Sequence, residues 1–210
     1  MSNFGEGLLR GFSEVVAEIQ QLLSSYNRPI VVAIDGGSGA GKSTLAFLIH
    51  SELDTALIPL DDFFSADIPD YQWSEFTVEE KLRYVFDWDR LRHRVIEPLL
   101  RGKPATWRAF DFESGLRVDG TYGMQDELKQ REPADVILVE GAYSAGPELA
   151  DLVDLAILVE VPVEERHARL EAREEREFLR QWHRIWDEVE SHYFAEVRPK
   201  GSFDVVVSPE

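Results

Sequence analysis

The chain of 210 residues contains no cysteine, and this absence excludes several kinds of site at once. A disulfide framework, a thiolate metal site and a thiol nucleophile all require cysteine. Long hydrophobic runs are also missing, so no stretch predicts a membrane span. The first residues lack the basic-then-apolar order of a signal peptide. Together these absences favour a cytoplasmic protein that does not act at a membrane.

Positive charge is in short supply. The chain has 22 Lys and Arg residues against 40 Asp and Glu residues, which gives a formal net charge of −18. A field of this sign repels nucleic acid and anionic membrane surfaces, so we expect neither as a partner. An uncharged small molecule suits it better. The length and the hydrophobic content of 44% predict a single domain over 1–210, and they leave the oligomeric state open, a homo-oligomer included.

One stretch organises the rest of the chain. An apolar, β-branched run at 30–34 predicts a buried strand, and a helical pattern begins at 45. Between them the sequence fits G-x-x-x-x-G-K-[ST], the phosphate loop of nucleoside-triphosphate-binding proteins. Lys42 can reach the β- and γ-phosphates, and the Ser43 hydroxyl can bind Mg²⁺. The residues expected to bind the triphosphate are Gly36, Gly37, Ser38, Gly39, Ala40, Gly41, Lys42, Ser43 and Thr44.

Apolar strands alternate with helical patterns along the whole chain. Strands are predicted at 30–34, 55–60, 136–139, 155–159 and 203–207. Helices are predicted at 5–26, after the phosphate loop, after a capping box that begins at Thr77, at 90–101, after Pro162 and at 181–197. A small hairpin is predicted from strands at 105–110 and 116–118. This alternation predicts an α/β fold with a parallel sheet covered on both faces.

Acidic residues follow two of the predicted strands. In such sheets ligands bind outside the carboxyl ends of the strands. Glu140 follows four apolar residues, where an ionised group is costly unless a cation or donors satisfy it, so we expect it at a metal. Either Asp61 or Asp62 can take the proton of an attacking hydroxyl. The alternatives are a Glu140 that exits to solvent and a turn or helix cap at Asp61-Asp62.

The order of these motifs resembles the uridine kinase and phosphoribulokinase family of P-loop kinases over about 30–173. Besides the loop, the matching segments are LDDFF, FDWD, RAFDFESGLR, VILVEGAYS and RLEAREE. The resemblance implies a P-loop fold with three α/β/α layers and a five-stranded parallel sheet of the nucleotide-monophosphate-kinase type. It also implies a small lid at about 169–182 and an acceptor-side insertion at about 61–120.

Together, the loop and the resemblance imply an ATP-dependent kinase that uses Mg²⁺ and a small hydroxyl acceptor. The expected catalytic residues are Lys42, Asp61 and Arg173. Arg169 is expected to contact the ATP phosphates, and Ser43, Asp61 and Glu140 are expected to hold the metal. The expected acceptor contacts are Asp62, Asp87, Phe110 and Arg117.

Two departures leave the acceptor open. Gly115 stands where nucleoside kinases of the family carry a histidine that contacts the pyrimidine, and the lid lacks the usual E-R-G. The acceptor could therefore be a nucleoside, a vitamin precursor, a sugar acid or an antibiotic. A catalytically silent nucleotide-binding protein is a further alternative. A switch GTPase is disfavoured, because asparagine occurs only at 3 and 27 and no N-K-x-D sequence exists.

Several candidates also have purely structural interpretations. Asp87 can be a helix cap and Phe110 a core residue. Arg169, Arg173 and Arg176 share a helical stretch with many glutamates, where surface ion pairs are the default. We expect packing roles for Trp182, Trp186 and Tyr193. The five histidines show no metal-like cluster in the sequence.

Overall fold

The structure is a computed structural model that describes residues 3–208, apart from the side chains of residues 3–6, 8, 176 and 178. Five parallel strands form one sheet in the order β2-β5-β1-β6-β7. They are β1 (Ile30–Asp35), β2 (Thr55–Pro59), β5 (Val136–Glu140), β6 (Leu155–Val159) and β7 (Val205–Val207). The predicted five-stranded parallel sheet is confirmed, with its last strand starting at 205 rather than at 203.

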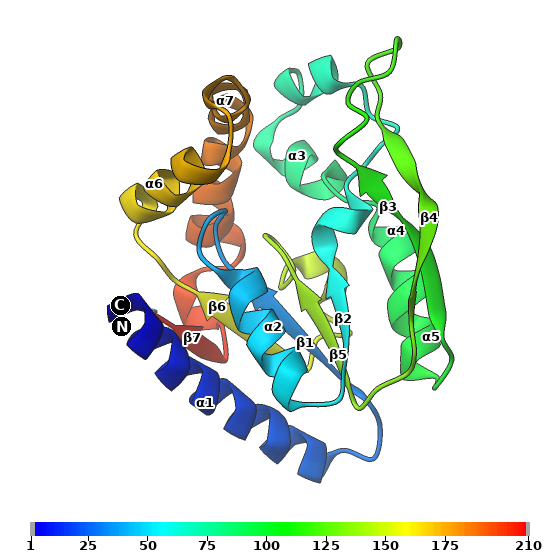
Figure 1. The fold of residues 1–210 in the computed structure, drawn as a ribbon, viewed down its shortest axis with the longest axis vertical. Coiled ribbons are helices and arrows are strands. Elements are labelled where there is room, and N and C mark those ends of the chain that lie inside the picture. The colour runs from blue at the N-terminus through cyan, green and yellow to red at the C-terminus, as the bar shows by residue number, and fades with distance from the viewer. Residues whose placement is uncertain (1–2, 209–210) are drawn as a thin grey trace.

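Helices cover both faces of this sheet (Figure 1). On one face, α1 (Asn3–Ser25) and α2 (Lys42–Glu52) pack against Val32 and Ile34 of β1. On the other face, Val31 belongs to a core shared with the helices after β2 and with the helix α7. Because side chains alternate along a strand, two faces of an apolar strand need two helical layers. The predicted three-layer α/β/α arrangement is confirmed.

The segment between β2 and β5 forms a helical layer and a separate hairpin. Its helices are α3 (Val78–Tyr84), α4 (Trp88–Leu91) and α5 (Glu97–Leu100). The predicted capping box starts α3, with the Thr77 hydroxyl accepting the Glu80 N–H at 3.2 Å and the Glu80 carboxylate accepting the Thr77 N–H at 2.9 Å.

The helix predicted at 90–101 is confirmed as a continuous helical segment from Trp88 to Leu100, with one irregular turn inside it. A π-helical turn at Arg92–Ile96 separates α4 from α5, and the Glu97 N–H donates to the Arg92 carbonyl. Pro98 lies in the next turn and has no N–H to donate to the carbonyl four residues before it. A π-bulge just before the proline relieves this mismatch without ending the helix.

The predicted hairpin has the right first strand and the wrong partner. β3 (Ala105–Asp111) pairs antiparallel with β4 (Gly123–Arg131), so 116–118 belongs to the connecting loop. β4 has the sequence GMQDELKQR, and of its residues only Gly123 is buried, whereas the others are half-buried or exposed. Because most of its residues are polar, β4 lacks the alternation of apolar residues that identifies strands, which explains why the pattern missed it.

The expected lid at 169–182 is the corner between two helices. These are α6 (Val163–Arg173) and α7 (Arg176–His192), which starts five residues before the predicted 181 and continues into a π turn at Tyr193–Val197. The corner and α3 lie at the same end of the molecule as the loop between β1 and α2 (Figure 1). Within residues 3–208, no helix combines the length and apolar character needed to cross a bilayer.

Candidate functional site

The phosphate loop connects β1 to α2 and has the backbone that its glycines allow. Gly39 and Gly41 adopt φ angles of 82° and 98°, in the left-handed region where a side chain would strain the backbone. The turn directs the chain into α2, whose N-terminus begins at Lys42. The Lys42 ammonium donates to the Gly37 carbonyl at 3.1 Å, so the lysine folds back over the loop. Backbone amides, the helix N-terminus and this lysine make a local site for an anion.

Ser43 and Glu140 meet at the edge of the loop. The Ser43 hydroxyl lies 3.2 Å and 3.1 Å from the two carboxylate oxygens of Glu140. β5 places Glu140 there, because it pairs directly with β1 and ends beside it. Burial raises the pKa of the Glu140 carboxyl, and the charge of Asp61 also raises it, whereas Lys42 and Ser43 lower it. The Glu140 carboxylate and the Ser43 hydroxyl thus meet near Lys42. This contact argues against the alternative in which the Glu140 side chain only points into solvent.

Asp61 lies in the short 3₁₀ turn that follows β2. Asp61 keeps solvent-exposed surface, although neighbouring protein atoms displace part of the water around its carboxylate. This partial loss of hydration raises the pKa of the Asp61 carboxyl, while the charges of Lys42 and Arg173 lower it. Among the described residues, none donates a hydrogen bond to this carboxylate. Asp61, Lys42 and Glu140 therefore share one electrostatic neighbourhood in which the Asp61 oxygens are available.

Asp62 is used quite differently from its neighbour. It is buried, and its carboxylate accepts from the Lys129 ammonium at 2.7 Å and from the Trp107 indole N–H at 2.8 Å. These contacts tie the turn after β2 to the β3–β4 hairpin. Of the two carboxylates that the sequence left open as the base, the geometry favours Asp61. The substrate contact expected of Asp62 stays a prediction. The hydrogen bonds from Lys129 and Trp107 argue against it, because they already occupy the Asp62 carboxylate.

The other expected acceptor contacts lie around the hairpin. Asp87 caps α4, accepting the Arg90 N–H at 3.0 Å, and pairs with the Arg90 side chain at 3.1 Å. Phe110 is buried against Phe64, with ring centroids 5.1 Å apart. Arg117 lies in the exposed loop between the hairpin strands. The structural alternatives for Asp87 and Phe110 are therefore present, and the acceptor roles of all three stay predictions.

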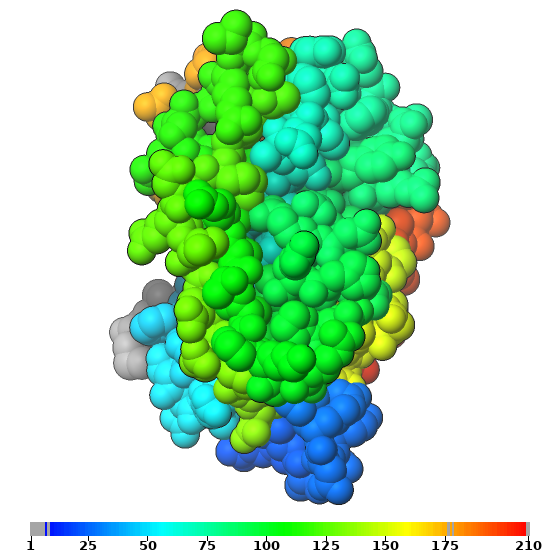
Figure 2. Space-filling model, turned by 90° about the vertical axis from the view of Figure 1, so that its right-hand side faces the viewer, coloured from blue at the N-terminus to red at the C-terminus, as the bar shows by residue number. Residues whose placement is uncertain are grey.

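A cavity of about 610 Å³ opens between the hairpin and α4. Figure 2 shows this face, with the hairpin on one side and the helical segment on the other. Phe64, Asp87 and Arg94 line the cavity together with side chains of the hairpin strands. Neither Lys42 nor Glu140 lines it, so the cavity does not lie at the phosphate loop.

Two lid arginines approach the loop and the carboxylates from α6. The Arg169 guanidinium donates to the Gly39 and Ala40 carbonyls at 3.3 Å and 3.4 Å, and it also pairs with Glu165. Arg173 pairs with Glu174 at 2.6 Å, yet its charge still acts on Asp61. Contacts of either arginine with phosphate stay predictions, and the Arg176 side chain lies outside the described residues.

The sequence analysis missed a buried acid at the start of the loop. Asp35, the last residue of β1, is fully buried and accepts from the backbone N–H groups of Gly36, Tyr143 and Ala145 at 2.7–3.0 Å. The Tyr193 hydroxyl donates to it at 2.6 Å, so this tyrosine does more than pack. Burial raises the pKa of Asp35 and the donors lower it. The signal was present, because Asp35 ends an apolar strand just as Glu140 does.

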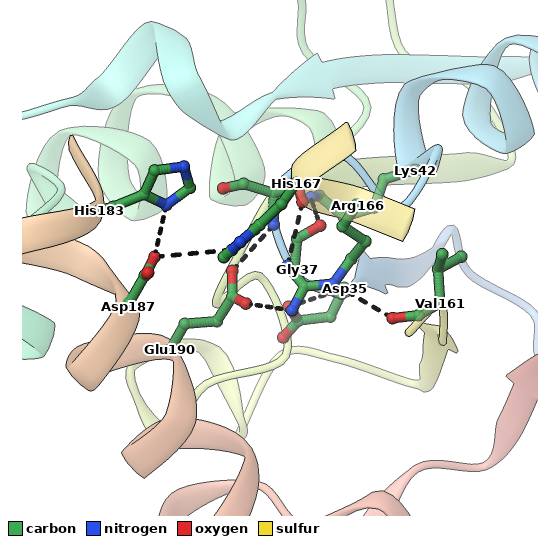
Figure 3. A network of polar contacts seen from close by, with 11 residues as sticks. Asp35, Gly37, Lys42, Val161, Arg166, His167, His183, Asp187 and Glu190 are labelled. Atoms are coloured by element: carbon green, nitrogen blue, oxygen red, sulfur yellow. Dashed lines mark hydrogen bonds and ion pairs between the residues drawn. The ribbon is translucent and has the colours of Figure 1, made fainter. Parts of the chain in front are cut away.

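A buried ion pair that grips the loop was also missed. The Arg166 guanidinium lies 2.6 Å from the Glu190 carboxylate, and both side chains are largely buried. Figure 3 shows this pair beside Gly37. Arg166 donates to the Ser38 carbonyl at 3.0 Å, while Glu190 accepts the Ser38 N–H at 2.9 Å. Arg166 on α6 and Glu190 on α7 thus bind both backbone polar groups of Ser38, its carbonyl and its N–H. No spacing in the sequence indicates this contact.

Comparison with known proteins identifies one family. The model of the phosphoribulokinase / uridine kinase family matches residues 31–193. A uridine kinase from Lactiplantibacillus plantarum is 31% identical over 185 residues, covering 84% of this chain and 80% of its own length. One from Streptococcus gordonii is 29% identical over 183 residues, covering 82% of this chain and 79% of its own length.

Solved structures share the fold at lower identity. A protein described as a possible uridine kinase from Bacillus stearothermophilus gives a TM-score of 0.64 at 19% identity, over 92% of this chain and 98% of its own. A candidate fructose transport system kinase from Silicibacter sp. TM1040 gives 0.62 at 20% identity, over 91% and 97%. The names of these two proteins differ in the compound they concern, so the fold alone does not specify an acceptor.

Proposed function

The chain belongs to the phosphoribulokinase / uridine kinase family, and from this premise we propose that it transfers the γ-phosphate of ATP to a hydroxyl group of a small molecule. The contact between Ser43 and Glu140 beside Lys42 carries the proposal. Phosphoryl transfer depends on positioning and on charge compensation more than on covalent chemistry of the protein. The residues gathered here supply both.

The phosphate loop positions the donor. Backbone N–H groups of 36–41 and the N-terminus of α2 bind the triphosphate, and Lys42 leaves the Gly37 carbonyl to contact the β- and γ-phosphates. Arg169 and Arg173 approach from the lid and compensate charge on the transferring group. Closure of the corner between α6 and α7 would exclude water from the reaction.

The oxygen atoms of Ser43 and Glu140 suit Mg²⁺. This ion prefers hard oxygen ligands, and it usually pairs one or two carboxylates with phosphate oxygens and water. The raised pKa of Glu140 reflects burial and the nearby Asp61 charge, which is an environment that a cation would relieve. Ser43 and Glu140 would hold the ion, which would supply positive charge to compensate the phosphates during transfer.

Asp61 is the proposed base. Its oxygens are not engaged by described hydrogen-bond donors, and its raised pKa brings it closer to that of a group able to hold a proton during transfer. The carboxylate accepts the proton of the acceptor hydroxyl as its oxygen attacks the γ-phosphorus. Asp62 holds the hairpin against this turn and thereby positions Asp61.

A nucleoside is the first acceptor class to consider, because the curated relatives described above are named uridine kinases. The second class is a non-nucleoside hydroxyl compound, such as a vitamin precursor, a sugar acid or an antibiotic. Gly115 is the reason to test this second class as well, because a glycine offers no side chain that could recognise a nucleoside base. Discrimination between similar acceptors depends on polar contacts that only one of them satisfies.

The test is a screen for acceptor-dependent ADP release. Purified protein is incubated with ATP, Mg²⁺ and a panel of nucleosides, sugars, sugar acids and vitamin precursors, and each phosphorylated product is identified by mass spectrometry. We expect ADP release that rises with at least one acceptor and matches product formation. The Lys42→Ala variant sets the background. If every acceptor stays at that background while ATP still binds, the protein is a silent nucleotide-binding protein and the proposal is wrong.

A further inference from the structure

Two histidines and an aspartate meet between the helices α6 and α7. His167 lies on α6, whereas His183 and Asp187 lie one turn apart on α7. We propose that these three side chains form a site for a transition-metal dication of the Zn²⁺ class. This site is separate from the Mg²⁺ site of Ser43 and Glu140, and it does not depend on the proposed kinase activity. The sequence showed no such cluster, because the fold creates it from two helices.

The geometry requires only small adjustments. His183 Nδ1 lies 2.8 Å from Asp187 Oδ1, and His167 Nε2 lies 4.0 Å from the same oxygen. All three ligand atoms lie within 4.8 Å of one another. In a tetrahedral zinc site, bond lengths of about 2.0–2.1 Å place neighbouring ligand atoms about 3.3 Å apart. The observed separations bracket that value, so rotations of the side chains suffice.

The arrangement of the rings also suits a shared ion. Figure 3 shows both imidazoles beside the Asp187 carboxylate, with His167 reaching from the opposite helix. The ring centroids lie 4.3 Å apart, and both histidines are only partly exposed. Neutral imidazole and carboxylate ligands select Zn²⁺ and its neighbours over Mg²⁺, which prefers oxygen alone. Three protein ligands leave a fourth position for water.

Occupancy would join the two helices that hold the phosphate loop. His167 directly follows Arg166, and Asp187 precedes Glu190 by three residues, about one helical turn. The Arg166–Glu190 pair, which contacts Ser38, lies one turn further along the same face of α7. A metal ion bound by His167, His183 and Asp187 would therefore cross-link α6 to α7 beside this pair, and it would stabilise the folded chain against heat.

The experiment uses the full chain, stripped of metals with a chelator and titrated calorimetrically with Zn²⁺ in excess Mg²⁺. We expect one Zn²⁺ per chain and a rise in melting temperature that the chelator reverses. His167→Gln and His183→Gln should each weaken this binding by at least about tenfold, since each removes one of three ligands. Far-ultraviolet circular dichroism reports whether the variants are folded, and Asp187→Asn provides a third variant that keeps both rings.

The chain offers a matched control in His93. His93 pairs with Glu97 at 3.2 Å, also four residues ahead on a surface helix, but no second histidine joins it. His93→Gln should leave Zn²⁺ affinity and stoichiometry unchanged. The proposal is overturned if Zn²⁺ shows no saturable binding, or if His93→Gln weakens binding as much as His167→Gln. Equal binding by wild type and the folded His167→Gln and His183→Gln variants would also overturn it.

Discussion

The phosphate-loop side and the hairpin side of this molecule are built in contrasting ways. Around the loop, buried polar groups fix the backbone: Asp35 joins three chain segments, and the Arg166–Glu190 pair holds Ser38. On the hairpin side, only Gly123 of β4 is buried, and the loop at 112–122 carries exposed apolar side chains, among them Phe112 and Val118. The backbone on the first side is fixed by buried polar contacts, whereas the second side exposes several apolar side chains to water.

This difference has a functional meaning. A triphosphate is the same in every kinase of this kind, so its site can be built rigidly from backbone and buried charge. Acceptors differ, and loops that project from a scaffold can vary without disturbing the core. We therefore expect substitutions on the loop side to affect turnover strongly and substitutions on the hairpin side to affect selectivity.

A large loss of turnover is expected from Lys42→Ala. The variant loses the cation that compensates charge on the phosphates, and turnover should fall by about 10²–10³-fold or more. The fold should persist, because Lys42 makes its hydrogen bond to the loop carbonyl of Gly37 and is only partly buried. Steady-state ADP release and circular dichroism measure the two properties. Lys103→Ala, at an exposed turn, is the control. Unchanged turnover in Lys42→Ala would remove the loop lysine from the mechanism.

Asp61→Asn should reduce turnover by about 10²–10⁴-fold, the range typical of a lost general base. ATP binding, measured by calorimetry, should remain, since the phosphates contact the loop and not this carboxylate. The neighbouring variant Asp62→Asn is the comparison. It weakens the contacts with Lys129 and Trp107 and should lower the free energy of unfolding by about 1–3 kcal/mol. If Asp62→Asn abolishes transfer and Asp61→Asn does not, our choice of base is wrong.

The sequence predicted the strand, loop and helix at 30–52 correctly because this pattern is local, whereas the binding roles of the loop residues stay predictions. Gly36 to Ser43 stand at fixed spacing between a strand and a helix, and that spacing has a direct physical meaning. Glu140 was found because a carboxylate after an apolar strand needs a partner. Asp35 satisfies the same argument, and applying it to every strand would have found it.

What the sequence could not predict depends on contacts across long separations. Glu190 and Arg166 reach Ser38 from 152 and 128 residues away, and no periodicity encodes such a meeting. The side chains of His167, His183 and Asp187 likewise come together only because α6 lies beside α7. The sequence analysis missed β4 for a different reason, because the mostly polar sequence of this strand has no alternation of apolar residues.

A smaller effect is expected from Glu190→Gln, which tests whether the ion pair positions the loop. Glutamine keeps an acceptor for the Ser38 N–H but removes the charge that pairs with Arg166. The KM for ATP should rise several-fold while kcat changes little, and the free energy of unfolding should fall by about 2 kcal/mol. Glu188→Gln, exposed on the same helix, should change neither. A fall in kcat alone would contradict a positioning role.

The raised pKa of Asp61 predicts how stability depends on pH. Partial loss of hydration raises the pKa of Asp61 in the folded protein above its value in the unfolded chain, so ionisation costs some folding free energy, which the remaining contact with solvent reduces. That cost is absent at low pH and grows as the pH rises from about 4 through the raised pKa. Asp61→Asn cannot ionise, so its melting temperature should gain on the wild type as the pH rises. An advantage that instead shrinks toward neutral pH would contradict the raised pKa.

The smallest effect concerns selectivity on the hairpin side. Without a polar side chain at Gly115, we expect uridine and cytidine to differ in kcat/KM by less than about tenfold, since polar contacts give the large discriminations. Gly115→His should widen this ratio, although the φ angle of 68° makes a side chain there cost about 1–2 kcal/mol. Gly102→His is matched, because Gly102 has the same φ of 68° and equally open surroundings. A strong wild-type preference for uridine over cytidine and purine nucleosides would contradict this prediction. It would mean that side chains other than that of residue 115 recognise the base, and that the hairpin side is specific despite its exposed surface.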